Sequence, residues 1–204
     1  DSRVAAVRPL DVLVVGAGLA GLALCVGLRR LDARITLIEI SPAPDETDAL
    51  LDRFMPEYDV VERHHLQVDA PAEVTFEASM DVDLEDSTIV RAIFLARELV
   101  LGAEDSVRPP GRGLIATTKA IGWRVLAEVP GREIVMGAVA QPWKPNPVFR
   151  GIDSEEFAAF AEPDHVKIVW TLRADPIGAD RSVARTETRV VATDAHARSA
   201  FRRY

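Results

Sequence analysis

Cysteine is nearly absent from this sequence, which has one, Cys25, in 204 residues. A single thiol excludes an internal disulfide and any metal site built from several cysteines. Basic residues are also in short supply, with 24 Lys and Arg against 32 Asp and Glu and a formal net charge of −8. This balance argues against nucleic acid, or an anionic membrane surface, as the main partner.

Sequence motifs for common catalytic sites are missing too. The chain contains no G-x-S-x-G nucleophile elbow, no H-E-x-x-H zinc helix and no P-loop spacing. His64 and His65 are adjacent, so on a strand they would point to opposite faces and could not share a metal ion. Glu62 and His64 would share a face, a pairing that is more often an ordinary polar contact than a catalytic or metal site. We therefore predict no metal site and assign no catalytic residue.

The most specific motif lies near the start of the chain. A short apolar run, 12–15, is followed by three glycines with the spacing G-x-G-x-x-G, a helix-period segment, a β-rich run at 35–38 and an acid. Strand, glycine turn, helix, strand and carboxylate follow one another in the order that a dinucleotide site requires. The predicted cofactor-binding residues are Gly16, Gly18, Gly21 and Glu39.

The run Val14-Val-Gly-Ala-Gly-Leu-Ala-Gly-Leu, continued by Leu37-Ile-Glu, resembles the start of FAD-dependent oxidoreductases, especially aromatic-ring monooxygenases. The resemblance covers about residues 11–40. It implies FAD as a cofactor and an oxidoreductase as one alternative function. A complete dinucleotide domain needs further βα units, which do not follow here, so the segment is at most a partial Rossmann-like βαβ.

A membrane segment is the other interpretation of this region. Residues 12–28 contain no charge and approach the roughly 20 apolar residues that span a bilayer. Arg3 and Arg8 before them suit a signal peptide or an anchor. The β-rich run that ends in an acid has no place in an anchor, so we expect a cytoplasmic protein, with a membrane-anchored one as the alternative.

The chain divides in two after a proline-rich, acidic stretch at residues 41–48. We predict a partial dinucleotide-binding-like βαβ segment with its linker over residues 1–48, and a separate domain over residues 49–204. A segment this short seldom folds alone, so it must pack on the following domain or on a partner.

Alternating apolar and polar residues dominate the second part. The patterns predict strands over 59–68, 123–129, 134–139, 166–172 and 182–191. They also predict helices beginning at Pro71, after Ser87 and near Asp194. Such alternation is typical of an antiparallel sheet with one solvated face. In the strand over 123–129, the odd-numbered residues from Trp123 to Val129 are expected to share a face.

Several short motifs punctuate these elements: Met55-Pro-Glu-Tyr-Asp-Val-Val-Glu-Arg-His, Val68-Asp-Ala-Pro-Ala-Glu-Val, Glu133-Ile-Val-Met-Gly-Ala-Val, Glu156-Phe-Ala-Ala-Phe, Thr186-Glu-Thr-Arg, Thr193-Asp and Phe201-Arg-Arg-Tyr. Together with the element order, they resemble a bacterial branch of the START-like helix-grip superfamily, also called SRPBCC or polyketide cyclase-like. The resemblance covers about residues 50–204. It implies an α+β fold in which an antiparallel sheet wraps a C-terminal helix and leaves an apolar cavity between them.

A small hydrophobic ligand, such as a lipid or a polyketide-like molecule, is the partner that this resemblance implies. Ligand cavities are mostly apolar with few polar groups, which makes four apolar residues candidate walls and one arginine a candidate contact for a polar head. These are Trp123, Met136, Phe160, Trp170 and Arg97. The same apolar residues would also make an ordinary core, and Arg97 could instead reach solvent. We expect non-covalent binding, and the sequence does not decide whether any reaction is catalysed.

Overall fold

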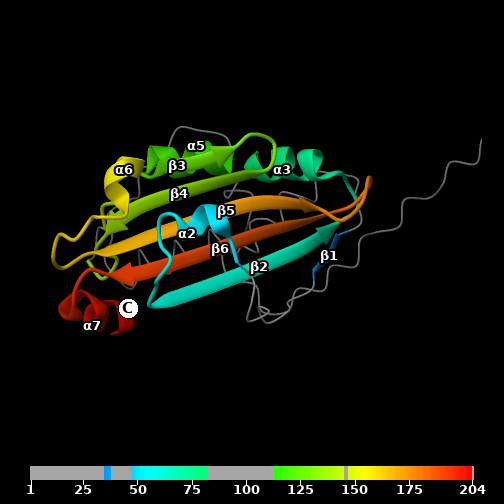
Figure 1. Ribbon diagram of the computed structural model, residues 1–204. Helices are drawn as coiled ribbons and strands as arrows, with labels where there is room; N and C mark the ends of the chain where they lie inside the picture. Colours follow the sequence, from blue (N-terminus) through cyan, green and yellow to red (C-terminus); the bar gives the residue numbers. More distant parts are fainter. Residues whose placement is uncertain (1–34, 38–46, 82–112, 145–146, 204) are drawn as a thin grey trace, which may run out of the picture.

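The structure, a computed structural model, describes residues 35–37, 47–81, 113–144 and 147–203. The fold is α+β (Figure 1). Its elements are β1 (Ile35–Leu37), α2 (Ala49–Asp52), β2 (Val60–Val68), α3 (Ala72–Met80), α5 (Leu114–Ala120), β3 (Arg124–Val129), β4 (Glu133–Ala140), α6 (Ser154–Phe157), β5 (Val166–Pro176), β6 (Ser182–Ala192) and α7 (Ala195–Arg203).

Several sequence predictions fall outside the described residues. They are the glycine motif with Glu39, the uncharged stretch at 12–28, the helix predicted after Ser87, and Arg97. Among the described residues, no helix has the length and apolar character needed to cross a membrane.

The strands form one open sheet in the order β1-β2-β6-β5-β4-β3, and every neighbouring pair is antiparallel. The strands predicted at 59–68, 134–139, 166–172 and 182–191 are confirmed as β2, β4, β5 and β6. The run expected to close the βαβ segment appears as β1, which pairs with the end of β2 through Ile35 and Val68. The only described strand of the predicted N-terminal segment is therefore an edge strand of the main sheet.

Local signals place the turns and helix ends correctly. Pro71 precedes the first turn of α3, where its missing N–H is no loss. The reversal between β3 and β4 closes with the Arg132 amide donating to the Val129 carbonyl at 3.1 Å, and Gly131 takes a φ of +68° there. At the other end, Asp194 Oδ1 accepts from the Ala197 amide at 2.7 Å and caps α7 as predicted.

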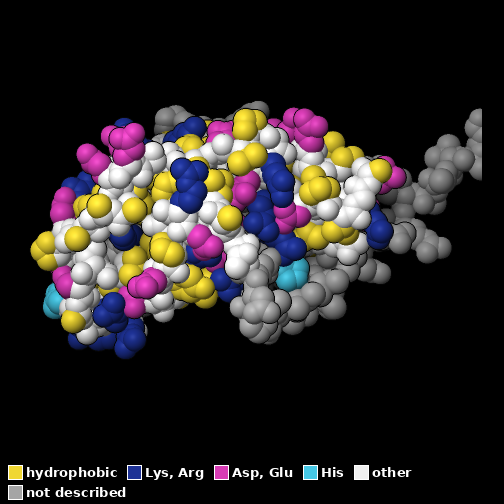
Figure 2. Space-filling view, viewed as in Figure 1, with side chains coloured by type: hydrophobic (Ala, Val, Ile, Leu, Met, Phe, Trp, Pro, Cys, Tyr) yellow, Lys and Arg dark blue, Asp and Glu magenta, His cyan; other side chains and the backbone are white. Residues whose placement is uncertain are grey.

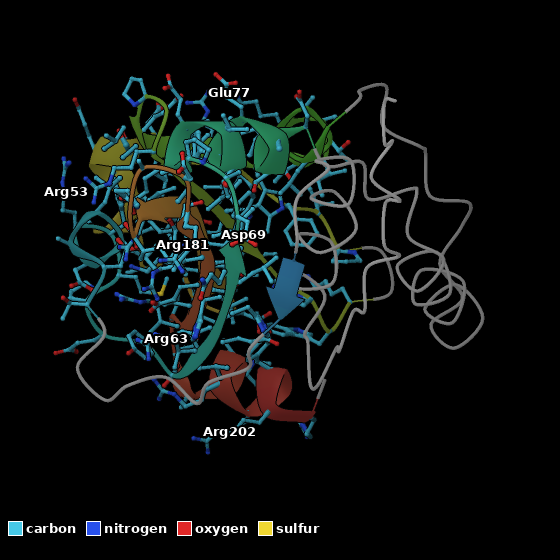
Figure 3. The ribbon with its side chains drawn as sticks, turned by 90° about the vertical axis from the view of Figure 1, so that its right-hand side faces the viewer. Arg53, Arg63, Asp69, Glu77, Arg181 and Arg202 are labelled. Atoms are coloured by element: carbon cyan, nitrogen blue, oxygen red, sulfur yellow. The ribbon has the colours of Figure 1, made fainter. Side chains whose placement is uncertain are left out.

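The sheet carries helices on both faces, so the expected single solvated face is wrong. We call the side bearing Trp170, covered by α3 and α7, the tryptophan face. The side bearing Arg189, covered by α2 and α6, is the arginine face. Every residue of β4 is buried, and Arg189 is only 2% exposed. Figure 3 shows Arg63 on the same side of the sheet as Arg53, which follows α2.

Strand β3 departs from simple alternation. A β-bulge interrupts its register with β4 between Val125 and Ala127. Val125 packs into the cluster on the tryptophan face, whereas Leu126 and Ala127 pack into the cluster on the arginine face. The prediction that alternate residues from Trp123 share one face holds for Trp123 and Val125 and is wrong for Ala127, because a bulge adds a residue and reverses the alternation.

Two apolar clusters therefore sandwich the middle of the sheet. On the tryptophan face, Phe76 and Ile115 pack on strand residues that include Met136. On the arginine face, Leu51 from α2 and Phe157 from α6 pack together over β4 and β5. The two layers therefore place β3, an edge strand of the sheet, between helices on both faces.

Candidate functional site

Three of the predicted cavity residues meet on the tryptophan face. Met136 and Trp170 are direct cross-strand partners, and Trp123 packs against the same cluster. Phe160 instead packs with the cluster on the arginine face, where the guanidinium of Arg150 lies 5.3 Å from its ring centroid. The structure thus brings together three of the four predicted apolar walls.

Trp123 occupies a junction on the tryptophan face. α3 packs towards one end of β5 and β6, through the cluster that includes Leu172, and α7 packs towards the other, through the cluster that includes Ile168. Trp123 contacts both clusters, and its ring stacks on Phe149 with centroids 5.4 Å apart. Because Trp123 is only partly buried, part of this apolar junction is open to solvent.

A cleft of about 610 Å³ opens beside this junction, between α5, β3 and the start of α6. Its size falls within the roughly 300–1,000 Å³ that is common for small-molecule sites. Its walls are Lys119, Trp123, Arg124, Val125, Asp153, Ser154 and Glu155.

The lining of the cleft contains both apolar and charged side chains. Trp123 and Val125 supply its apolar surface, while Arg124 and Asp153 form an ion pair across it. Lys119 has no ion-pair partner among the residues that the structure describes. The cleft can therefore accept a molecule with an apolar body and a polar end.

Glycine shapes the wall of this cleft. Gly122 has a φ of +102°, and a Cβ there would collide with the Phe149 carbonyl. Only glycine allows the chain to pass this close to another backbone segment. Gly122 directly precedes Trp123, which lines the cleft.

The arginine face carries an ionic layer that alternation alone assigned to solvent. Arg189 lies at its centre, with Nε donating to Glu187 at 2.6 Å and Nη1 donating to Asp52 at 2.5 Å and to the Met55 carbonyl at 2.7 Å. Its guanidinium also lies 4.8 Å from the ring centroid of Tyr58. Each of these contacts offsets part of the large cost of burying a charge.

Glu187 joins a second arginine to the layer. Arg63 approaches it through two nitrogens, with Nε 2.8 Å from Oε2 and Nη2 3.0 Å from Oε1, and Nη2 also donates to the Tyr58 hydroxyl. The hydrogen bond to Glu187 raises the pKa of Arg63 further above its usual range. Figure 2 shows basic and acidic side chains intermixed in the middle of this face.

A carboxyl pair lies at the other end of the layer. Arg173 donates to Asp48 Oδ2 at 3.2 Å, and its cross-strand partner is Glu133. Thr171 donates to Glu133 Oε1 at 3.3 Å. Burial, followed by the charge and hydrogen bond of Asp48, raises the pKa of Glu133 to about 7. Such a shift is common in functional sites, although ion-pair networks also produce it.

The space in this layer is small. The cavity bounded by Asp48, Arg63, Thr171, Arg173 and neighbouring side chains measures about 10 Å³, which is room for about one water molecule. A substrate does not fit there. We therefore treat the layer as part of the architecture and the cleft beside Trp123 as the candidate binding site.

Metal binding finds no support in the part of the chain that the structure describes, where no group of three or more His, Cys, Asp or Glu residues is placed to hold an ion. His64 Nε2 lies 3.0 Å from Glu62 Oε1, so the expected same-face contact is present as an isolated pair. The candidate cofactor-binding glycines lie outside the described residues.

The ionic layer was missed because charged residues at alternating strand positions normally face water. One signal was present in the sequence: Arg185, Glu187 and Arg189 alternate in sign along one face of β6, and Arg173 and Asp175 do so on β5. Opposite charges on neighbouring strands can neutralise one another under a covering helix.

Comparison of the chain with protein-family models, with curated proteins and with solved structures finds no match.

Proposed function

We propose that this protein binds a small, largely apolar molecule non-covalently in the cleft beside Trp123. One observation carries the proposal: Trp123 and Val125 belong both to the apolar cluster of the tryptophan face and to the wall of the 610 Å³ cleft. A ligand there would extend an existing apolar surface. The charged groups around it would orient a polar end.

The energetics suit a modest affinity. Each Å² of apolar area that a ligand buries yields roughly 25 cal/mol, and the gain here is modest because only Trp123 and Val125 give the cleft an apolar surface. Immobilising the ligand consumes part of this gain. We therefore expect weak binding, with dissociation constants in the millimolar range.

The resemblance to START-like proteins supports the same function, and membership of the helix-grip type is part of the proposal. In that fold type a ligand lies between the sheet and the last helix. Here α7 has nine residues and packs at one end of β5 and β6. The cleft beside Trp123, between α5, β3 and α6, is the better supported position for the ligand.

Blocking the cleft tests this proposal. The amphipathic dye 1-anilinonaphthalene-8-sulfonate is titrated into the protein by calorimetry and by dye fluorescence. Ser154→Trp places a large side chain into the cleft from an exposed position on α6, and Ser199→Trp makes the same change at an exposed position on α7. We expect Ser154→Trp to weaken binding at least about tenfold, a loss of about 1.4 kcal/mol, and Ser199→Trp to leave it unchanged. Absence of dye binding to the parent, or equal binding by Ser154→Trp, contradicts the proposal.

The glycine spacing motivates a second proposal, of a different class. We propose as the alternative that Gly16, Gly18, Gly21 and Glu39 hold FAD in an oxidoreductase. A visible absorption spectrum of the purified protein detects a bound flavin. Gly18→Ala should weaken FAD binding, because a methyl group would then occupy the space of the pyrophosphate. Equal FAD affinity of variant and parent would reject the alternative.

A further inference from the structure

The short helix α2 is held on the arginine face by a few identifiable contacts. It has four residues, fewer than an isolated helix needs to be stable in water. Leu51 supplies a fully buried apolar contact, and two carboxylates reach the sheet. Asp48 accepts from Arg173, and Asp52 accepts from Arg189.

Asp48 has two roles in this attachment. Its Oδ1 accepts from the Leu51 amide at 2.9 Å and caps the helix, while its Oδ2 accepts from Arg173 at 3.2 Å. The side chain is 6% exposed. Anything that disturbs Asp48 therefore acts on the helix and on its attachment to β5 together.

Glu133 is placed to disturb it. It is 7% exposed, it lies opposite Arg173 in the pairing of β4 with β5, and its hydrogen-bond donor is Thr171. Asp48 and Glu133 thus share the neighbourhood of one arginine. A second negative charge beside Asp48 is disfavoured, so Glu133 retains its proton more readily than a separate acid would.

The other charges around the pair are already matched. Arg189 pairs with Asp52, Arg63 with Glu187, and Arg185 with Asp175. The groups facing Asp48 and Glu133 from the packed elements, among the described residues, are Arg173 and Asp175 on β5, Arg185 and Glu187 on β6, and Arg63 and His65 on β2. Arg173 also pairs with Asp175 at 2.8 Å, whereas Glu133 has no ion pair of its own among the described residues.

We propose that α2 is a pH-dependent clasp, which stays closed while Glu133 carries a proton and opens when Glu133 ionises. The second negative charge repels Asp48 and competes with it for Arg173. Asp48 then loses its hold on β5, and the single turn of α2 separates from the sheet. Because burial and Asp48 raise the pKa of Glu133 to about 7, the change falls near neutral pH.

Opening would uncover a specific surface. Leu51, Phe54 and Met55 leave an apolar cluster that also contains Phe157 and Val169. Arg189 loses Asp52 and the Met55 carbonyl as partners. The backbone pairing of β2, β6 and β5 does not include α2, so we expect the opening to be local.

Hydrogen exchange at single amides tests the proposal on the full chain. The reporters are the amides of Leu51, Asp52 and Met55, which are bonded to Asp48 or within α2, and the amides of β5 and β6 serve as internal reference. Protection factors are measured between about pH 5.5 and 8.5 and corrected for intrinsic exchange. We expect protection in α2 to fall about tenfold across this range, as a change of about one pKa unit produces, while protection in β5 and β6, which reports unfolding of the whole sheet, stays far higher than that of α2 at every pH.

A matched pair of variants identifies the group responsible. Glu133→Gln mimics the protonated acid and should abolish the pH dependence, whereas Glu128→Gln removes a charge from an exposed position on neighbouring β3 and should preserve it. In the parent, the carboxyl carbon of Glu133 should titrate with the same midpoint as the loss of protection, a measurement that needs no variant. Constant protection in the parent, a different midpoint, or a persistent pH dependence in Glu133→Gln overturns the proposal.

Discussion

Arg189 stands on β6 at a position where a strand residue of an open sheet would face water. It is instead among the most buried large side chains of the described chain, with two carboxylates, a carbonyl and an aromatic ring around it. Arginine suits this position because its fork of donors serves several acceptors at once. The residue shows how a strand face that alternates in charge can still be a covered layer.

Removing this charge should be costly. Arg189→Met keeps an unbranched apolar stem, but it removes one cation from the buried Glu187 and the partner of the partly exposed Asp52. We expect the free energy of unfolding to fall by about 3–5 kcal/mol, the range for breaking a buried ion pair, as measured by chemical denaturation.

Arg132→Met is the control for this prediction. Arg132 is 59% exposed and lies 3.5 Å from Asp175, and such surface pairs contribute about 0–1 kcal/mol. Equal destabilisation by both variants would show that the buried ion pairs contribute no more to stability than the exposed one.

Glu133 makes a prediction about stability and pH. Its pKa rises from 4.5 in the unfolded chain to about 7 in the folded protein, so between these values the folded state binds more protons. Stability from this group is therefore present below about pH 4.5 and is lost as the pH rises to about 7. The difference corresponds to roughly 3 kcal/mol.

Glu133→Gln should remove this loss. We expect the variant to be more stable than the parent at pH 8, by about 2–3 kcal/mol, with the difference shrinking as the pH falls towards 4.5. Denaturation curves at a series of pH values measure it. Parallel stability profiles for variant and parent would mean that Glu133 ionises like an ordinary surface acid.

At the scale of elements, single hydrogen bonds join parts that are distant in sequence. Ser182, at the start of β6, is fully buried, and its hydroxyl lies 2.9 Å from the Ala70 carbonyl and 2.8 Å from the Thr75 hydroxyl. These contacts fasten β6 to the beginning of α3. These hydrogen bonds lie within a layer that is otherwise apolar.

Ser182→Ala should loosen that junction. The change leaves buried polar atoms of Ala70 and Thr75 without a partner, which typically costs about 1–3 kcal/mol. Thermal and chemical denaturation measure the loss. Ser199→Ala, at an exposed position of α7, is expected to change stability by less than about 0.5 kcal/mol. A neutral Ser182→Ala would indicate that water replaces the hydroxyl.

The bulge in β3 belongs to the same scale. It sends Val125 to one face and both Leu126 and Ala127 to the other. Leu126 fills the space beside Gly137. A Cβ on Gly137 would collide with Cδ1 of Leu126 and lie 3.0 Å from its Cγ. The local sequence of β3 does not predict the bulge, because the bulge depends on how β3 packs against β4 and the helices.

At the scale of the whole molecule, the described chain forms one sheet. β1, from the predicted N-terminal βαβ segment, pairs with β2, and Asp48 connects the start of α2 to β5. A boundary between residues 48 and 49 therefore separates groups that contact one another. FAD binding remains a prediction for the segment that carries the three glycines.

Truncation tests where the independently folding unit begins. A chain starting at Thr47 keeps Asp48 and should unfold in a single cooperative thermal transition. A chain starting at Ala49 loses the cap of α2 and the partner of Arg173, so we expect its Tm to be lower. In a domain of this size, each kcal/mol of lost stability lowers the Tm by about 2–4 °C. Equal melting temperatures would show that Asp48 is dispensable. A non-cooperative melt of the longer chain would show that the N-terminal segment completes the core.

The sequence by itself determined the strands of the main sheet, the hairpin after β3, the start of α3 and the cap of α7. These depend on interactions between near neighbours: the two-residue period of a strand, the fixed φ of proline, and a carboxylate reaching an amide three residues on. It also placed Trp123, Met136 and Trp170 on apolar faces, where strand pairing brought them together.

Only the tertiary structure decided which faces are covered, where β3 bulges, and that Phe160 packs away from Trp170. It alone joined Asp48 to Arg173 and Asp52 to Arg189, across 125 and 137 residues of chain. A charged residue on a strand looks the same in sequence whether water or a helix lies above it. The free energy of placing it depends on its partners in space, and those partners come from the packing of distant elements.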